Sequence, residues 1–280
     1  MIQAIKNQVI LVTGATDGLG KQVAFDLAAR HATVLLHGRN REKGEAALQQ
    51  IRDATGNQRL FYYNADFSSL DEVRLLAEQV QAGQRRLDVL INNAGIGPGR
   101  RLPRRENSID GHELRFAVNY LASFLLTHGL LPLLQRSVPA RIINVASVGQ
   151  QPIDFDNVML ENDYDGLRAY RQSKLAQVMF TFDLAEDLKE SGITVNCLHP
   201  ASLMPTKMVL ETDYFASTMS TIAAGAQAVE HLAVSVDLDG VSGEYFDGKL
   251  QGRANPQAYD KQARQQLRML SKQLTHLRDP

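Results

Sequence analysis

Tyr170 and Lys174 are the residues in this sequence whose types and spacing most directly indicate chemistry. On a helix they stand one turn apart, so their side chains share a face. A free tyrosine has a pKa of about 10 and exchanges protons poorly near neutral pH. A neighbouring ammonium stabilises the phenolate and moves that pKa toward the working range. The pair therefore predicts a tyrosine that donates or accepts a proton, while the same spacing on an amphipathic helix also fits a purely structural role.

A glycine-rich segment near the start of the chain has the composition of a phosphate-binding loop. Residues 13–20 read Thr-Gly-Ala-Thr-Asp-Gly-Leu-Gly and lie between a short apolar run and a helix-like stretch. Glycines allow a tight turn, and the free N–H groups at a helix N-terminus attract negative charge. Three glycines alone would fit an ordinary turn. Their place between a first strand and a first helix favours a pyrophosphate site.

Short runs of apolar and β-branched residues predict the strands that carry these motifs. The runs are 8–13, 33–37, 60–65, 87–91, 141–147, 193–199 and 244–247. Helical periodicity lies between them at 18–30, 41–54, 69–82, 110–136, 169–190 and 221–236. Ser69 and Glu72 have the spacing of a capping box, and Gly192 is expected to be left-handed just past the end of a helix.

Strands that alternate with helices predict an α/β fold, here a doubly wound, seven-stranded parallel sheet with helices on both faces. The alternation continues without a break in composition, which predicts a single domain over 1–280. The segments 96–109, 148–168 and 199–220 follow the fourth, fifth and sixth strands. They leave the carboxyl edge of the sheet, where open α/β sheets bind ligands.

Composition excludes several classes of protein. The 280 residues are 44% hydrophobic and 22% charged, and their net charge of −1 lacks the basic excess of a general nucleic-acid binder. The start of the chain does not read as a signal peptide, and polar residues interrupt the apolar stretch 121–134, so no membrane span is expected. A lone cysteine, Cys197, fits a reducing compartment and core packing. We predict a cytoplasmic protein.

No metal site is expected, because the seven histidines lack the H-E-x-x-H spacing and one cysteine cannot build a thiolate cluster. His199 ends a predicted strand beside the expected cofactor site, and a structural placement is favoured there over acid–base work.

The G-x-x-x-G-x-G spacing after Thr13 resembles that of the short-chain dehydrogenase/reductase family, a group of Rossmann-fold enzymes. Residues 92–95, Asn-Asn-Ala-Gly, are similar to the family's NNAG motif. Asn119, Ser147, Tyr170 and Lys174 resemble its catalytic tetrad in order and in the elements that carry them. The resemblance covers essentially the whole chain. The segments 116–127 and 153–156 look most like the branch of the retinol dehydrogenases and the WW-domain oxidoreductase.

The resemblance implies hydride transfer between a nicotinamide and the carbon of an alcohol or carbonyl. It implies that Tyr170 exchanges the proton with the substrate oxygen, that Lys174 also binds the nicotinamide ribose, and that Ser147 holds the substrate oxygen. It further implies that Asn119 supports a water that relays protons to the lysine. Taken alone, Ser147 also fits a strand-end hydroxyl and Asn119 a buried amide that satisfies a carbonyl.

The end of the second predicted strand favours NADP (NADPH) over NAD. An NAD enzyme places a carboxylate there, but residues 37–40 read His-Gly-Arg-Asn. The Arg39 guanidinium can make paired bonds to a 2′-phosphate, with a solvated loop charge as the alternative. Asp17 opposes this prediction with a negative charge in the glycine loop. The resemblance places Asp66 on the adenine amino group, with helix capping as the equal alternative.

The complete set of residues predicted to bind the cofactor is Gly14, Thr16, Asp17, Gly18, Leu19, Gly20, Arg39, Asn40, Asp66, Phe67, Asn93, Ala94, Gly95, Tyr170, Lys174, Pro200 and Leu203.

The segment 199–220 is predicted to cover the substrate. It departs from the family where Pro200 is followed by Ala201 and where Thr206 comes one residue late. Three methionines between 203 and 219 predict a flexible cover over an apolar alcohol or carbonyl substrate. A basic cluster stands nearby and fits either a solvated loop or the capture of an acidic group; its members are Arg100, Arg101, Arg104 and Arg105.

Other functions on the same fold are alternatives. A sensor or scaffold that binds the nucleotide without turnover has no need of the Tyr170–Lys174 pair. Enoyl reductases of the family space these two residues more widely, and the longer sugar epimerases add a domain.

The oligomeric state has two readings. Apolar residues surround much of the predicted helix 169–190, which favours a homodimer or homotetramer. The alternative is a monomer capped by an amphipathic C-terminal helix over 256–277, which carries Leu267, Leu270, Leu274 and Leu277.

Overall fold

The structure is a computed structural model that describes residues 3–100 and 104–277. Its centre is one sheet with the strand order β3-β2-β1-β4-β5-β6-β7-β8. The strands are β1 (Val9–Val12), β2 (Thr33–Gly38), β3 (Leu60–Asn64), β4 (Val89–Asn92), β5 (Ala140–Val145), β6 (Ile193–His199), β7 (Tyr245–Asp247) and β8 (Leu250–Gln251). The α/β class and the alternating order are those expected from the sequence.

The predicted count of seven strands is wrong by one. The seven expected strands are present and parallel, and β8 adds an antiparallel edge to β7. The chain reverses between these two strands at Gly248, whose φ of 61° is left-handed. A strand of two residues has too few side chains to show the alternation that identifies a strand in sequence.

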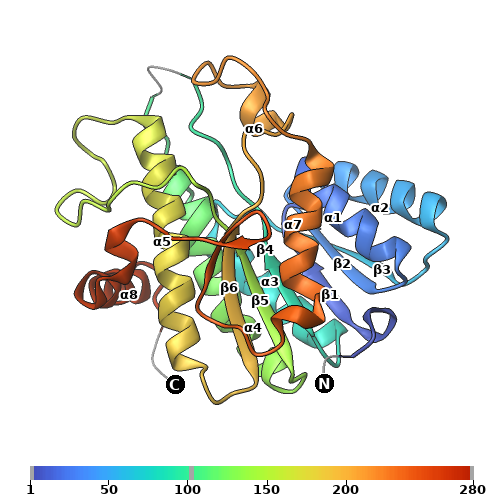
Figure 1. Ribbon diagram of the computed structural model, residues 1–280. Helices are drawn as coiled ribbons and strands as arrows, with labels where there is room; N and C mark the ends of the chain where they lie inside the picture. The colour runs from blue at the N-terminus through green and yellow to red at the C-terminus, as the bar shows by residue number, and fades with distance from the viewer. Residues whose placement is uncertain (1–2, 101–103, 278–280) are drawn as a thin grey trace.

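Helices cover both faces of the sheet (Figure 1). One face carries α1 (Gly18–Ala29), α2 (Arg41–Thr55) and α7 (Ile222–Val234). The other carries α3 (Leu70–Gly83), the π-helical segment η2 (Phe116–Leu121), α4 (Ala122–Gln135) and α5 (Gly166–Asp187). Short helices complete the described chain: η1 (Ile5–Asn7), α6 (Lys207–Leu210), η3 (Val236–Leu238) and η4 (Pro256–Tyr259), with the longer α8 (Lys261–Leu274) near the C-terminus.

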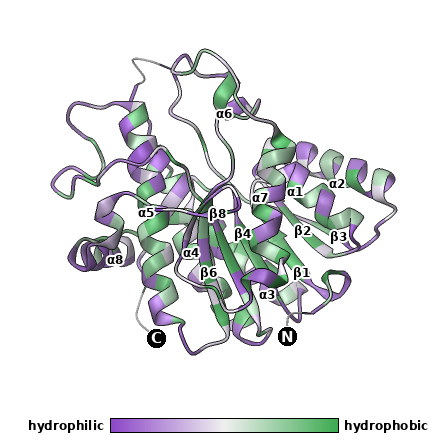
Figure 2. Ribbon diagram, viewed as in Figure 1, coloured by the Kyte–Doolittle hydropathy of each residue, from purple (hydrophilic) through white to green (hydrophobic). Residues whose placement is uncertain are grey.

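Two hydrophobic cores fill the spaces between the sheet and its helices. Figure 2 shows the central strands as the most hydrophobic part of the ribbon, with polar residues on the outer sides of the helices. β1 alternates between the cores, since Leu11 faces one and Ile10 and Val12 face the other. Burial on both faces is the reason that parallel strands read as continuous apolar runs.

Side-chain caps set the helix starts. Ser69 accepts a hydrogen bond from the Glu72 amide and begins α3, as the capping-box spacing predicts. The Glu72 carboxylate turns to the Asp66 amide instead, at 2.7 Å. Gly192 has a left-handed φ of 78°, but α5 already ends at Asp187, so this glycine stands in the following turn and not directly at the helix end.

The C-terminal helix packs on the body of the protein. Leu267 of α8 is buried, and Leu270, Leu274 and Leu277 contact the core more loosely. The Ser271 hydroxyl lies 2.6 Å from the Tyr120 hydroxyl of η2. The predicted helix 256–277 is therefore a short η4 followed by α8, and it covers part of α5 (Figure 1).

One described helical stretch, Phe116–Gln135, has the length and a mean hydropathy of 1.4 that a membrane crossing requires. Within the fold, 78% of its most apolar window is buried. Core helices of soluble proteins pass the same test, so this stretch is weak evidence for a membrane span.

Candidate active site

A large cavity opens at the carboxyl edge of the sheet, with a volume of about 990 Å³. The glycine loop forms one end of its wall, and Ser147, Tyr170 and Lys174 form its floor farther along. The three loops that were expected to leave this edge all contribute to the wall. One space therefore joins the predicted nucleotide site to the predicted catalytic residues.

The glycine loop needs its glycines because other backbone lies against it. Gly14 and Gly18 have left-handed φ values of 66° and 51°. A Cβ at Gly20 would lie 2.2 Å from the Gly14 carbonyl oxygen, so no larger residue fits there. The Asn93 side chain donates to the Thr13 carbonyl at 2.8 Å and ties this loop to the Asn-Asn-Ala-Gly segment. Asn93 thus shapes the loop as well as lining the cavity.

His37 is a supporting residue that sequence analysis missed. Its Nδ1 accepts from the Gly14 amide at 3.3 Å, and its Nε2 lies 3.1 Å from the Ala65 carbonyl. Burial lowers the pKa of His37 to about 4, which keeps the ring neutral and lets one nitrogen accept while the other donates. The ring also stacks on Phe67, with a centroid distance of 4.3 Å. The only sequence signal was its place beside Gly38 and Arg39.

Three residues of the predicted cofactor set, which follow β2 and β3, have different surroundings. Arg39 lines the cavity, and none of the hydrogen bonds or ion pairs found among the described residues engages its guanidinium. Asn40 is not part of the cavity wall, because its side chain caps α2 by accepting from the Lys43 amide at 2.9 Å. Asp66 lines the cavity while its carboxylate accepts from the Ser68 amide, so Ser69 and not Asp66 caps α3.

The floor of the cavity brings three of the predicted catalytic residues together. Ser147 and Tyr170 line the cavity side by side, and the Lys174 Nζ lies 5.9 Å from the centre of the tyrosine ring. Burial raises the pKa of Tyr170, and the nearby Ser147 hydroxyl lowers it by less. Burial also lowers the pKa of Lys174 to about 7. In this structure burial therefore outweighs the expected effect of the ammonium on the phenol.

Asn119 lies behind the cavity wall. Its Oδ1 accepts from the Ile96 amide at 2.7 Å, and its Nδ2 donates to the Ile96 carbonyl at 3.1 Å and to Ser173. These contacts fit the structural alternative for Asn119, a buried amide that satisfies backbone groups. The same side chain lies beside Gly95, where an added Cβ would be 3.2 Å from Asn119 Oδ1 and 3.6 Å from Lys174 Nζ. Asn119 thus holds the 95–96 backbone next to the lysine.

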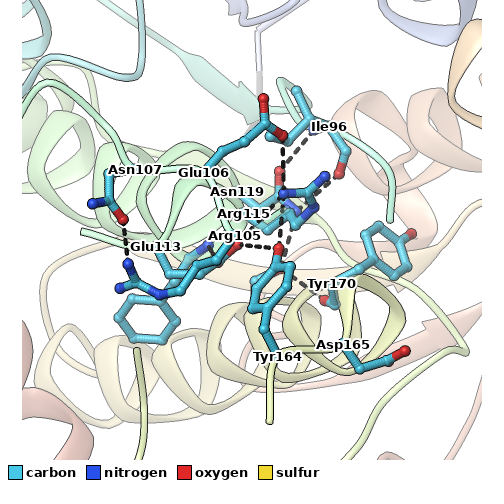
Figure 3. A network of polar contacts seen from close by, with 12 residues as sticks. Ile96, Arg105, Glu106, Asn107, Glu113, Arg115, Asn119, Tyr164, Asp165 and Tyr170 are labelled. Atoms are coloured by element: carbon cyan, nitrogen blue, oxygen red, sulfur yellow. Dashed lines mark hydrogen bonds and ion pairs between the residues drawn. The ribbon is translucent and has the colours of Figure 1, made fainter. Parts of the chain in front are cut away.

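A buried arginine connects the loops around the cavity (Figure 3). Arg115 donates to the Gly97 carbonyl at 3.2 Å and to the Tyr164 hydroxyl at 2.9 Å. Its guanidinium also lies 3.6 Å from Glu113, whose other oxygen accepts from the Phe116 amide at the start of η2. These residues escaped sequence analysis because no motif or periodicity links them.

The segment 199–220 lies across the opening. Thr206 packs on Gly18, and Lys207 forms an ion pair with Asp17 of the glycine loop. The pair lowers the pKa of Asp17, so its carboxylate stays charged and is neutralised by the lysine. The negative charge of Asp17, which counted against NADP in the sequence, is therefore offset by Lys207. Sequence analysis did not detect this contact.

Apolar side chains make up most of the wall beyond the catalytic floor. They are Ile96, Pro98, Ile109, Leu114, Val118, Val148, Leu167, Met204, Met208, Val209, Phe215 and Met219. Pro200 and Leu203 line the cavity as predicted residues of the cofactor set, together with Gly14, Thr16, Asp17, Gly18, Leu19, Gly20, Phe67, Asn93, Ala94 and Gly95.

The described members of the basic cluster, Arg100, Arg104 and Arg105, do not line the cavity. Arg100 and Arg104 are exposed, and Arg105 donates to the Met159 carbonyl at 2.8 Å and to Asn107. Arg101 lies outside the described residues.

His199 and Cys197 both belong to β6. His199 lines the cavity and bonds Ser202 at 3.0 Å. Cys197 is fully buried, and burial raises the pKa of its thiol to about 12, which fits core packing.

Comparison with known proteins identifies the class. The profile of the short-chain dehydrogenases matches residues 8–214. The chain belongs to the short-chain dehydrogenase family and is an NAD(P)-dependent oxidoreductase that acts on CH–OH groups.

The chain is similar to the retinol dehydrogenases. It is 39% identical to human retinol dehydrogenase 13 over 99% of this chain and 87% of that protein. It is 37% identical to human retinol dehydrogenase 11 over 86% of this chain and 77% of that protein. The predicted similarity to the retinol dehydrogenases is confirmed.

Solved structures share the fold. A protein from Mycobacterium paratuberculosis matches with a TM-score of 0.76 and 28% identity over 98% of this chain and 95% of that one. A short-chain dehydrogenase from Shigella flexneri, complexed with NADP, matches with a TM-score of 0.71 and 28% identity over 87% of this chain and 97% of that one.

Proposed function

We propose that this protein is an NADP-dependent oxidoreductase that interconverts an apolar alcohol and its ketone or aldehyde, with Tyr170 as the acid and base. The single observation that carries the proposal is one cavity of about 990 Å³, which holds the glycine loop, the Ser147–Tyr170–Lys174 floor and an apolar wall. Reacting groups that share a water-excluding space can act on one bound substrate.

The residues present fit NADP. The glycine loop and the start of α1 offer backbone N–H groups to a pyrophosphate, and the unengaged Arg39 guanidinium lines the far end for a 2′-phosphate. Lys207 neutralises Asp17 beside that loop. The Shigella relative was crystallised with NADP, which supports the same preference here. When bound, the nicotinamide supplies the hydride or accepts it.

The chain's own residues orient the substrate and move the proton. The Ser147 hydroxyl lines the cavity beside Tyr170 and is placed to hold the substrate oxygen. Tyr170 donates its phenolic proton when a carbonyl is reduced and takes a proton back when an alcohol is oxidised. The Lys174 ammonium stabilises the phenolate form, and Asn119 holds the 95–96 backbone against the lysine. The apolar wall excludes water from these groups.

The apolar wall of the cavity also supports an apolar alcohol or carbonyl compound as the substrate. Methionine and aliphatic side chains bury apolar surface and offer few hydrogen-bond partners, so a polar substrate would lose hydration without compensation. Names of the retinol dehydrogenases agree with an apolar alcohol. A cytoplasmic location and a dimeric or tetrameric state stay predictions from the sequence.

Replacement of Tyr170 with phenylalanine tests the proposal. We expect Tyr170→Phe to lower kcat for NADPH-dependent reduction of decanal by about a thousandfold, because the proton donor is lost. NADPH binding, measured by fluorescence titration, should change little, since the phenylalanine retains the ring. Turnover equal to that of the wild type would refute the role of Tyr170. Tight NADPH binding with no turnover of any apolar aldehyde or ketone by the wild type would favour a nucleotide sensor instead.

A further inference from the structure

The Lys174 ammonium is held by two uncharged acceptors. It donates to the Val145 carbonyl at 2.9 Å and to the Gln177 side-chain oxygen at 2.8 Å. Lys174 is 3% exposed and Gln177 is 1% exposed. Among the residues that the structure describes, none of the ion pairs involves this lysine, and burial lowers its pKa to about 7.

We infer that Gln177 is a positioning residue, which fixes the Lys174 ammonium against the end of β5 while leaving it charged and one of its N–H groups free for the ligand in the cavity. This inference rests on the proposed function of Lys174. A lysine ammonium has three N–H donors, and the protein engages two of them. Because Lys174 also lines the cavity, the remaining donor is available to a ribose hydroxyl or to the Tyr170 oxygen.

The neutral amide suits this role better than the alternatives at position 177. A carboxylate there would pair with the ammonium and hold its charge away from Tyr170. An aliphatic side chain would leave the buried cation with one acceptor, and a buried charge that lacks hydrogen bonds loses its proton. Gln177 supports the charged form without neutralising it.

A second observation indicates that Gln177 is not present for packing alone. Its Nε2 is buried and has no hydrogen-bond partner in the structure. A buried amide with an unsatisfied donor destabilises a fold relative to an apolar side chain of similar volume. The bond that its oxygen makes to Lys174 accounts for the presence of the amide in spite of this cost.

Gln172 is a matched control on the same helix. It is also a glutamine of 1% exposure with an unpartnered Nε2. Its oxygen accepts from Arg168 at 3.3 Å, whereas the acceptors of Lys174 are Val145 and Gln177. Gln172→Met and Gln177→Met therefore make the same chemical change at equal burial, and only the second removes an acceptor from the lysine.

The first readout needs no catalysis. The protein is labelled with ¹³C at lysine Cε, and the Lys174 signal is identified by its loss in Lys174→Met. We expect Gln177→Met to lower the pKa of Lys174 by about one unit, because a hydrogen bond to the charged form is lost. Gln177→Glu should raise it, and Gln172→Met should leave it unchanged. An unaltered Lys174 titration in both Gln177 variants, or an equal shift in Gln172→Met, would overturn the inference.

The second readout is the pH profile of decanal reduction with NADPH. Reduction requires the protonated lysine, so the fall in kcat/KM at high pH should move to lower pH by about one unit in Gln177→Met. The other titratable groups that line this cavity are Asp17, His37, Arg39, Asp66, Tyr170, Arg171, His199 and Lys207. They are the same in the Gln172 and Gln177 variants, so the comparison isolates the lysine.

The two readouts separate two kinds of failure. If wild type and Tyr170→Phe turn over equally well, the proposed function fails, while the titration still decides whether Gln177 holds the ammonium. If catalysis depends on Tyr170 but the pH profile of Gln177→Met matches that of the wild type, the positioning role is wrong and the proposed function stands.

Discussion

At the scale of single residues, the site depends on which side chains keep hydrogen-bond donors that are not used within the protein. Arg39 has no partner among the described residues, whereas Asn40 next to it is committed to capping α2. Within the described part of the chain, Lys174 has one N–H group without a partner and Gln177 has two. The sequence assigns Arg39 the selection of NADP and includes Asn40 only in the wider cofactor set, and the hydrogen bond of Asn40 shows why the two side chains differ in availability.

Arg39 is predicted to select NADPH. A guanidinium that binds a phosphate with two charge-assisted hydrogen bonds contributes on the order of 1.5–3 kcal/mol, or ten- to about a hundredfold in affinity. Arg39→Ala should weaken NADPH binding by about that factor in a fluorescence titration and leave NADH binding nearly unchanged. Arg41→Ala is the control, because Arg41 is exposed, pairs with Glu45 and does not line the cavity. An undiminished preference for NADPH in Arg39→Ala would show that another group reads the 2′-phosphate.

At the scale of elements, the substrate end of the cavity is held by one cationic centre. Arg115 joins the loop after β4, the start of η2 and the loop before α5 through Gly97, Glu113 and Tyr164 (Figure 3). Both charged residues of the pair are nearly inaccessible, with side-chain exposures of 5% and 1%. Removing one buried partner leaves the other charge without compensation, so this contact makes the three segments interdependent.

Arg115→Met is predicted to destabilise the protein strongly. The buried Glu113 carboxylate would lose its cation, at a cost of about 3 kcal/mol in the free energy of unfolding. The double variant Arg115→Met, Glu113→Gln should recover most of this loss, because a neutral amide oxygen can still accept from the Phe116 amide. Urea unfolding of the wild type, both single variants and the double variant measures the coupling. Additive effects would mean that the two residues act independently.

At the scale of the whole molecule, a single chain buries the apolar surface of α5, which the sequence analysis interpreted as favouring a dimer or tetramer. Six large apolar residues of α5 have exposures of 5% or less within this chain; they are Leu175, Val178, Met179, Phe180, Phe182 and Leu184. Packing of α8 on α5 contributes to this cover, and Arg264 and Arg268 pair with acids of α5. The apolar circumference of that helix is thus explained without a dimer.

The interface between α1 and α7 makes stability depend on pH. Burial and the neighbouring Asp26 carboxylate, which can accept the Glu230 proton and repels a charged Glu230, raise the pKa of Glu230 from 4.5 to about 7. The folded state therefore holds this proton more tightly than the unfolded state, and stability falls as pH rises from about 4.5 through 7. Arg30 lies 3.7 Å from Glu230, and its positive charge only partly offsets the effect of burial and of the Asp26 charge on the Glu230 pKa.

Glu230→Gln is expected to remove the loss of stability that the wild type shows as pH rises. Because Glu230 is partly exposed, solvent screening limits the gain to the order of 1 kcal/mol, or about 2–4 °C in Tm. The gain should be present at pH 8 and absent at pH 4, where the wild-type carboxyl is protonated in both states. Calorimetric Tm values of the two proteins across this range provide the measurement, and a difference independent of pH would contradict the assigned titration.

The sequence by itself determined the alternation of strands and helices, the glycine loop and the order of the tetrad. Burial imposes a period on strands and helices, and a tight turn against other backbone admits only glycine, so both leave a mark in the sequence. Only the tertiary structure decided that Asn40 caps α2, that Lys207 neutralises Asp17, that Arg115 links three loops and that Gln177 holds Lys174. The contacts of Lys207 and Arg115 join segments distant in the chain, so their partners depend on where the folded backbone brings them. Asn40 and Gln177 bond groups only three residues away, and the sequence leaves open whether such a polar side chain turns to that neighbour, to the cavity or to solvent.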